Sequence, residues 1–100
     1  MTRPPVAEST TVSVAKHLVA AEAQDDTIIL DPVASRYFGL AEVGSRVWDL
    51  LQTPRRVGDL RDAIVAEYEV DPDVALADLL RLVTELAEAG LVDVDHGQAR

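Results

Sequence analysis

In the first part of the chain, short hydrophobic runs are separated by turn residues, which is the pattern of β-strands. One strand is expected within residues 12–24, where β-branched residues are frequent. A second covers 27–30 and a third covers 35–40, and the link between them contains Pro32, which cannot donate to a sheet. Because both links are short, the pattern predicts a three-stranded antiparallel meander.

From about residue 41 onwards, apolar residues recur at helical intervals of three and four. This spacing predicts helices over about 41–51, 57–69 and 72–89, followed by a last short strand over 91–94. Strands followed by helices indicate an α+β domain, and the order resembles a winged helix-turn-helix: a three-stranded antiparallel sheet followed by three helices.

The expected third strand, 35–40, has no obvious pairing partner after it, because the chain becomes helical at once. It is therefore expected at a sheet edge, which natural proteins usually cover or blunt. An edge that stays open can bind an extended peptide as an added strand.

The helix expected over 72–89 is apolar over an unusually wide arc. Asp71 suits its N-cap, Pro72 its first position and Gly90 its C-terminal end. One apolar stripe consists of Ala75, Leu79, Leu82 and Leu86, and a second consists of Leu76, Leu80, Val83 and Ala87. Either both stripes are buried in the core, or one of them borders the edge strand and forms a peptide-binding cleft with it.

Length and composition set the class of protein. One hundred residues with 48% hydrophobic side chains form one domain, expected over 11–94 between a disordered arm, 1–10, and a flexible tail, 95–100. No apolar run suggests a membrane span or a signal peptide, so a cytoplasmic location is expected. The absence of cysteine excludes disulfides and thiolate chemistry.

Few residues are suited to catalysis, metal binding or nucleic-acid binding. The only histidines are His17 and His96, and no serine lies in a nucleophile motif, so no enzyme activity, cofactor or metal is expected. A net charge of −9 repels nucleic acid. The third helix would have to read DNA, but it carries four acidic residues against Arg81 alone: Asp73, Asp78, Glu85 and Glu88.

An ordered series of short segments extends over residues 17–94. The segments are Ile29-Leu-Asp31, Arg36-Tyr-Phe-Gly-Leu40, Glu42-Val-Gly44, Val47-Trp48, Ala66-Glu-Tyr-x-Val70 with Asp71, Asp78-Leu-Leu-x-Leu-Val-x-Glu-Leu86 and Gly90-Leu91. In this order they resemble the PqqD-like proteins, which are the recognition elements for ribosomally made, modified peptides. The Tyr-Phe-Gly-Leu form is most similar to the leader-binding B1 component of lasso-peptide biosynthesis.

The resemblance implies a non-catalytic protein that binds the leader of a precursor peptide. The leader would pair with the third strand, rest on the third helix, and be presented to a leader-cleaving cysteine protease and a lasso cyclase. The residues implied in leader binding are Ser35, Arg36, Tyr37, Phe38, Gly39, Leu40, Leu76, Leu79, Leu80 and Val83. Alternation places Tyr37 and Phe38 on opposite faces, so only one of them can be the main pocket wall.

Two alternatives remain open at this level. The chain could be a PqqD-type peptide chaperone for another modified-peptide or cofactor pathway, or a winged-helix module that docks a folded protein. Two positions depart from the family pattern: Ala41 and Arg56 stand where an N-capping Asn and Thr are common. Each missing cap would cost about 1 kcal/mol of stability unless a neighbour substitutes.

Overall fold

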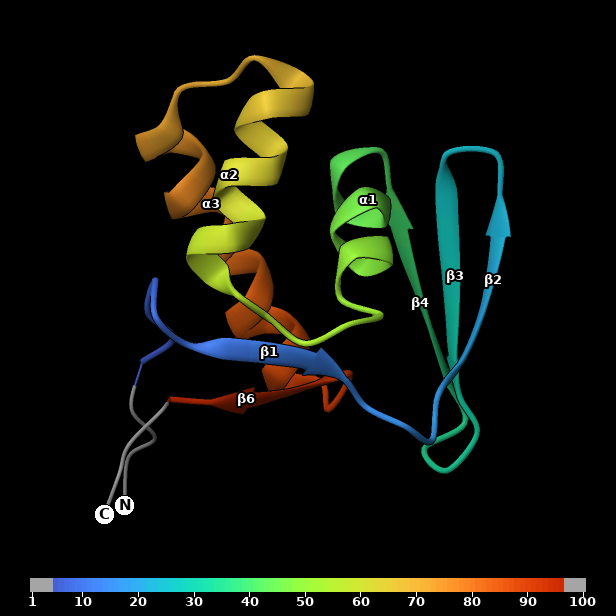
Figure 1. The fold of residues 1–100 in the computed structure, drawn as a ribbon. Coiled ribbons are helices and arrows are strands. Elements are labelled where there is room, and N and C mark those ends of the chain that lie inside the picture. Colours follow the sequence, from blue (N-terminus) through green and yellow to red (C-terminus); the bar gives the residue numbers. More distant parts are fainter. Residues whose placement is uncertain (1–4, 97–100) are drawn as a thin grey trace.

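The strand-rich first part of the chain folds into two sheets rather than one (Figure 1). The computed structural model describes residues 5–96, and the predicted arm and tail therefore lie partly outside the described residues. The elements in chain order are β1 Thr11–Val14, β2 Val19–Ala23, β3 Asp26–Asp31, β4 Arg36–Ala41, α1 Val43–Leu50, β5 Arg55–Arg56, α2 Val57–Tyr68, α3 Pro72–Glu88 and β6 Val92–Asp95. The predicted α+β class, with a three-stranded antiparallel sheet and three helices, is confirmed.

One sheet is the predicted meander, with strand order β2-β3-β4. Ile29 pairs with Ala20 on one side and with Phe38 on the other, which fixes the register of all three strands. The turn before β3 contains Gln24 in the left-handed region, at φ 61°, and the turn before β4 ends on Ser35 at φ 55°. β4 is an edge strand of this sheet, as the sequence predicted.

The second sheet has strand order β5-β1-β6, and it corrects one prediction. The single strand expected within residues 12–24 is in fact two strands, and the first of them belongs to this sheet. There β1 pairs along its length with β6, so that Val12 faces Val94. The last strand was predicted correctly to within one residue, whereas the two-residue β5 was not predicted.

The core lies between the inner face of the meander and the three helices. Ile29 is fully buried on that face, and Trp48 of α1 and Leu60 of α2 are buried with it. The hydroxyl groups of Thr27 and Ser45, both buried, form a hydrogen bond that fixes α1 over β3. This bond satisfies two polar groups that would otherwise be costly to bury.

Of the helices within residues 5–96, α3 alone has a side-chain N-cap. Asp71 accepts hydrogen bonds from the backbone N–H groups of Asp73 at 2.8 Å and Val74 at 3.4 Å. The helix ends in a Schellman motif, in which Gly90 has φ 78° and Leu91 donates to the carbonyl of Leu86 at 2.9 Å. The other two helices have Glu42 and Arg56 at their N-cap positions, and neither side chain caps its helix; the N-cap of α1 is thus one residue later than the expected position 41.

Residues just before β1 make specific backbone contacts. Gly58 donates to the carbonyl of Glu8 at 2.9 Å and Val57 donates to that of Thr10 at 3.0 Å, which attaches this segment to the start of α2. Arg61 also pairs with Glu8 at 2.6 Å. Within residues 5–96, no helix has the length and apolar character needed to cross a membrane.

Candidate functional site: an open strand edge beside an apolar groove

The free edge of β4 carries backbone groups that its own sheet does not use. Glu42 donates to the carbonyl of Asp25 at 3.1 Å, in register with the β3–β4 ladder. Hydrogen-bonded pairs alternate along an antiparallel ladder, so Phe38 and Leu40 exchange bonds with β3. The N–H and C=O groups of the intervening residues, Tyr37, Gly39 and Ala41, therefore point towards the free edge.

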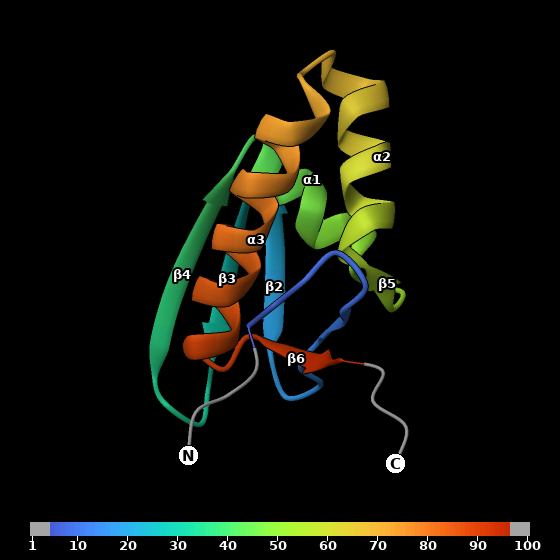
Figure 2. The same ribbon diagram turned by 90° about the vertical axis from the view of Figure 1, so that its left-hand side faces the viewer.

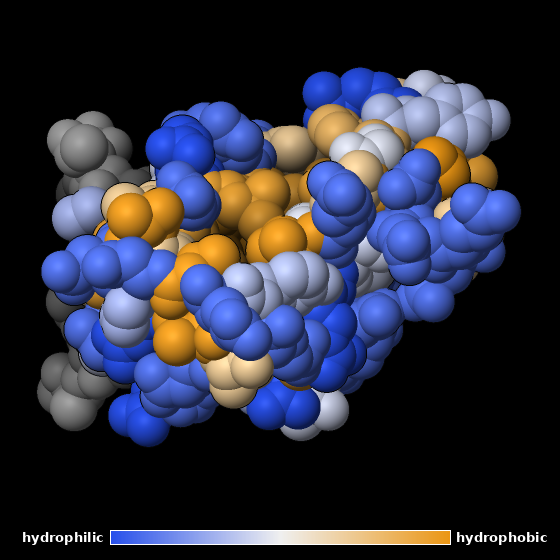
Figure 3. Space-filling model, turned by 90° about the horizontal axis from the view of Figure 1, so that it is seen from above, coloured by the Kyte–Doolittle hydropathy of each residue, from blue (hydrophilic) through white to orange (hydrophobic). Residues whose placement is uncertain are grey.

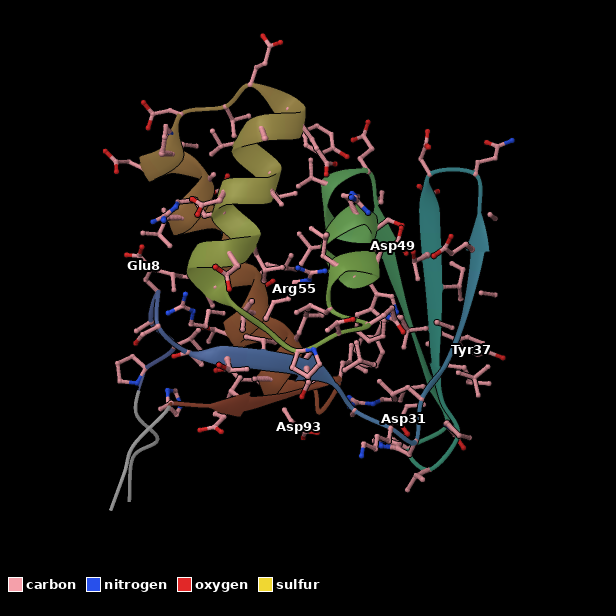
Figure 4. All side chains as sticks on the ribbon, viewed as in Figure 1. Glu8, Asp31, Tyr37, Asp49, Arg55 and Asp93 are labelled. Atoms are coloured by element: carbon pink, nitrogen blue, oxygen red, sulfur yellow. The ribbon has the colours of Figure 1, made fainter. Side chains whose placement is uncertain are left out.

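The two faces of β4 separate its aromatic residues. Phe38 and Leu40 lie on the inner face, partly buried against the core. Tyr37 lies on the outer face and is 73% exposed, and its side chain points away from the helices (Figure 4). Of the two aromatic residues, Phe38 is thus the one on the side of the helices. Ser35 lies in the turn, so the strand begins one residue later than predicted.

A groove of about 400 Å³ opens where β4 passes into α1. Viewed from above, hydrophobic atoms are exposed in a hollow among the helices (Figure 3). Apolar residues dominate the lining and come from three helices and the α2–α3 link. They are Val43, Gly44, Ile64, Val70, Val74, Ala75, Leu79 and Leu82.

The orientation of α3 decides which of its two apolar stripes belongs to the groove. Leu79 and Leu82 line it, and Leu82 is only partly buried. Around the helix axis, Leu76 is about 60° and Leu80 about 100° from Leu79, on the side away from Leu82. Neither of them lines the groove. Val83 is fully buried in the core. Of the four α3 residues predicted for leader binding, the groove contains only Leu79.

Several groove residues were not among the predicted site residues. Helical periodicity grouped Leu82 with Leu79 in one apolar stripe. It did not show whether that stripe would line the groove or pack into the core. Val43 is the first residue of α1 and Val74 the third residue of α3, and their exposed fractions are 37% and 55%. Apolar residues in the first turns of two helices, where polar and acidic residues are common, are a signal that sequence reasoning could have used.

Charged residues form one margin of the groove. Asp78 accepts a hydrogen bond from Arg81 at 2.8 Å, which leaves Glu85 as the unpaired carboxylate among the described lining residues. Arg46 of α1 donates two bonds to Glu67 of α2, at 2.8 and 2.9 Å. The bond from Arg46 lowers the pKa of Glu67, so this ion pair links α1 and α2, two of the three helices that line the groove, when both groups are ionised.

At the opposite end of β4, Arg36 connects the strand to α3. Its Nη2 donates to the carbonyl of Ala89 at 3.4 Å, and its guanidinium carbon lies 5.1 Å from the centroid of the Phe38 ring. The β4 edge thus extends from Arg36 beside the end of α3 to the groove at the start of α1 (Figure 2). Within the described residues, no group of three or more potential ligands is placed to hold a metal ion.

Comparison with known proteins identifies the family. Residues 26–92 match the family model described as coenzyme PQQ synthesis protein D, PqqD. This match covers most of the chain and includes β3, β4 and all three helices, so the chain belongs to the PqqD family. None of the curated proteins matches the chain.

Three solved structures share the fold. The structure of TbiB1 in complex with the TbiA(beta) leader peptide is 35% identical, covers 88% of this chain and 99% of its own, and superposes with a TM-score of 0.77. A lasso peptide synthetase B1 complexed with the leader peptide is 24% identical, with coverages of 87% and 99% and a TM-score of 0.74. The PqqD truncation of Methylobacterium extorquens PqqCD is 19% identical, with coverages of 88% and 94% and a TM-score of 0.74. The last two show likeness of fold alone.

Proposed function

We propose that this protein binds the leader of a ribosomally made precursor peptide and performs no chemistry on it. The leader adds as a strand to the free edge of β4. The observation that carries the proposal is the position of that edge, whose unused backbone groups lie at Tyr37, Gly39 and Ala41 and which ends beside an apolar groove. Main-chain bonds supply affinity in this mode and pockets for alternate side chains supply specificity.

The comparisons support the same role. TbiB1, which is 35% identical to this chain, is described in complex with a leader peptide, and residues 26–92 match the PqqD family model. We assign the present chain to lasso-peptide biosynthesis, where the bound leader is presented to a leader-cleaving cysteine protease and a lasso cyclase. The net charge of −9 favours encounter with a leader that carries basic residues.

The outer face of the meander is the surface that we assign to the protease. Three of its large apolar residues are exposed: Val19 by 57%, Ile28 by 45% and Tyr37 by 73%. Tyr37 and Val19 both face Leu30 across the strands, which places them in one row. A leader strand added to β4 would extend this face, so a protein docked there would contact the peptide as well.

Ile28→Lys should weaken protease binding and leave leader affinity unchanged.

Proline substitution tests strand addition. Gly39→Pro removes an amide at the free edge without removing a bond between β3 and β4. The matched control is Ala20→Pro, because the same alternation directs the Ala20 amide to the opposite free edge, on β2. The probe is a dye-labelled TbiA(beta) leader peptide, which is described in complex with the similar TbiB1, and it is titrated by fluorescence anisotropy. Gly39→Pro should abolish saturable binding and Ala20→Pro should retain it; equal affinity of the two variants would contradict strand addition at β4.

A further inference from the structure

Arg36 is an arginine whose hydrogen-bonding capacity is largely unused. Its Nη2 donates to the carbonyl of Ala89 at a long 3.4 Å, and this is its one hydrogen bond within residues 5–96. A guanidinium carries five N–H donors in a planar fork. Four of the six described arginines pair with carboxylates: Arg46, Arg56, Arg61 and Arg81. Within the described part of the chain, Arg36 and Arg55 have no such partner.

The position of Arg36 connects this unused capacity with the peptide-binding edge. It shares the inner face of β4 with Phe38, and the contact with the Phe38 ring, at 5.1 Å, holds the guanidinium over that ring. The bond to Ala89 holds it at the end of α3. A strand added to β4 would therefore end beside a cation that is already oriented, and covering by the peptide would strengthen any ion pair formed there.

We propose that Arg36 is a specificity-determining residue that pairs with an acidic side chain of the bound leader, at the end of the leader that lies beside the start of β4. This inference rests on the proposed function. A carboxylate accepts two parallel N–H bonds from a guanidinium, so it is the peptide group that best matches the unused donors.

Such a pair would fix the register of the added strand. Backbone bonds along an edge are the same at every second residue, so they do not define which leader residue enters the groove. An acidic residue on Arg36 and an apolar residue in the groove define two points at opposite ends of β4. The −9 charge of the protein disfavours acidic peptides in general, so an acidic residue selected at this one position would be a distinctive signature.

A random-peptide display library tests the inference without knowledge of the natural leader. The library is selected against the wild-type protein, Arg36→Gln and Arg55→Gln, each checked for folding by far-ultraviolet circular dichroism. Arg55 is the matched control, because it also lacks a carboxylate partner among the described residues and β5 lies on the opposite side of the molecule from β4 (Figure 2). We expect an acidic residue at a fixed distance from an apolar residue in peptides selected by the wild type and Arg55→Gln, and no acidic preference with Arg36→Gln.

Titration of one selected peptide completes the test. Replacing its acidic residue by the corresponding amide should weaken binding to the wild type about fivefold and have no effect on binding to Arg36→Gln. An equal loss with both proteins, or selected peptides without an acidic position, would overturn the role of Arg36 and leave strand addition intact. If none of the three proteins enriches any peptide, the proposed function fails and the role of Arg36 fails with it.

Discussion

Ile29 and Phe38 face each other across β3 and β4 on the inner side of the sheet. Ile29 is fully buried, whereas Phe38, on the edge strand, is only partly covered by the core. An added strand would cover the remaining surface of Phe38. The pair thus marks where the core of the protein ends and where a peptide would continue it.

Phe38 and Tyr37 should therefore respond differently to truncation. Phe38→Ala removes apolar surface on the helix side, and we expect peptide affinity to fall roughly tenfold, or about 1.4 kcal/mol. Tyr37→Ala changes the outer face and should leave affinity within about twofold. Titration of the labelled leader against both variants checks this. A larger loss for Tyr37→Ala would mean that the peptide lies on the other face of the sheet.

Leu82 and Leu80 provide a matched test of the groove. Both are partly buried on α3, but only Leu82 lines the groove. Leu82→Ser should weaken peptide binding at least tenfold, because a leader side chain would lose its apolar contact. Leu80→Ser should lower stability with little effect on affinity. Calorimetry measures the peptide affinity of both folded variants. If Leu80→Ser alone loses affinity, the peptide binds to the stripe that contains Leu76 and Leu80.

More of the fold than of the candidate site could be predicted from the sequence. Asp71, Pro72 and Gly90 defined the ends of α3 because capping depends on local sequence. The division of residues 12–24 into β1 and β2 could not be predicted, since no glycine or proline separates them and β1 pairs with the distant β6.

Both apolar stripes of α3 were visible in the sequence. Which stripe faces β4 depends on the rotation of the helix in the assembled core, and periodicity does not contain that information. The same holds for Phe38 and Tyr37: alternation separated them, and only the paired register with β3 placed Phe38 inside.

The turn between β3 and β4 should weaken at low pH through Asp31. Its carboxylate accepts bonds from the backbone N–H groups of Ala34 and Val33, both at 3.1 Å, and lies 3.4 Å from Nε2 of His17. The bond from Ala34 is the largest cause that lowers the pKa of Asp31 in the folded state. Because this pKa is lower than in the unfolded chain, the carboxylate stabilises the fold above about pH 3.9, and the contribution is lost as the pH falls through the folded pKa.

Asp31→Ala measures that contribution. In urea unfolding, the stability difference between wild type and variant should be largest near about pH 6 and should shrink towards about pH 3. Asp31→Asn is the control, because its amide oxygen can still accept the backbone bonds but carries no charge. A difference for Asp31→Ala that is the same at both pH values would contradict the assigned cause.

Asp71 should be the most important cap of the molecule. Asp71→Ala leaves two N–H groups at the start of α3 without their acceptor and should cost about 1 kcal/mol, which lowers Tm by about 4 to 8 °C. Asp73→Ala, two residues further along the chain, removes a first-turn carboxylate that accepts no hydrogen bond within residues 5–96; its favourable interaction with the helix dipole is lost, which should cost about a few tenths of a kcal/mol. Thermal unfolding compares the two, and equal costs would show that the cap bonds do not contribute.

Amide hydrogen exchange, followed by NMR without and with a saturating leader peptide, is the most direct test of strand addition. The N–H groups of Phe38 and Leu40 already bond to β3, so their exchange should be slow in both states. Strand addition predicts that exchange at Tyr37, Gly39 and Ala41 becomes at least about tenfold slower when the peptide is bound. Saturating binding that leaves exchange at these three amides unchanged would contradict the account.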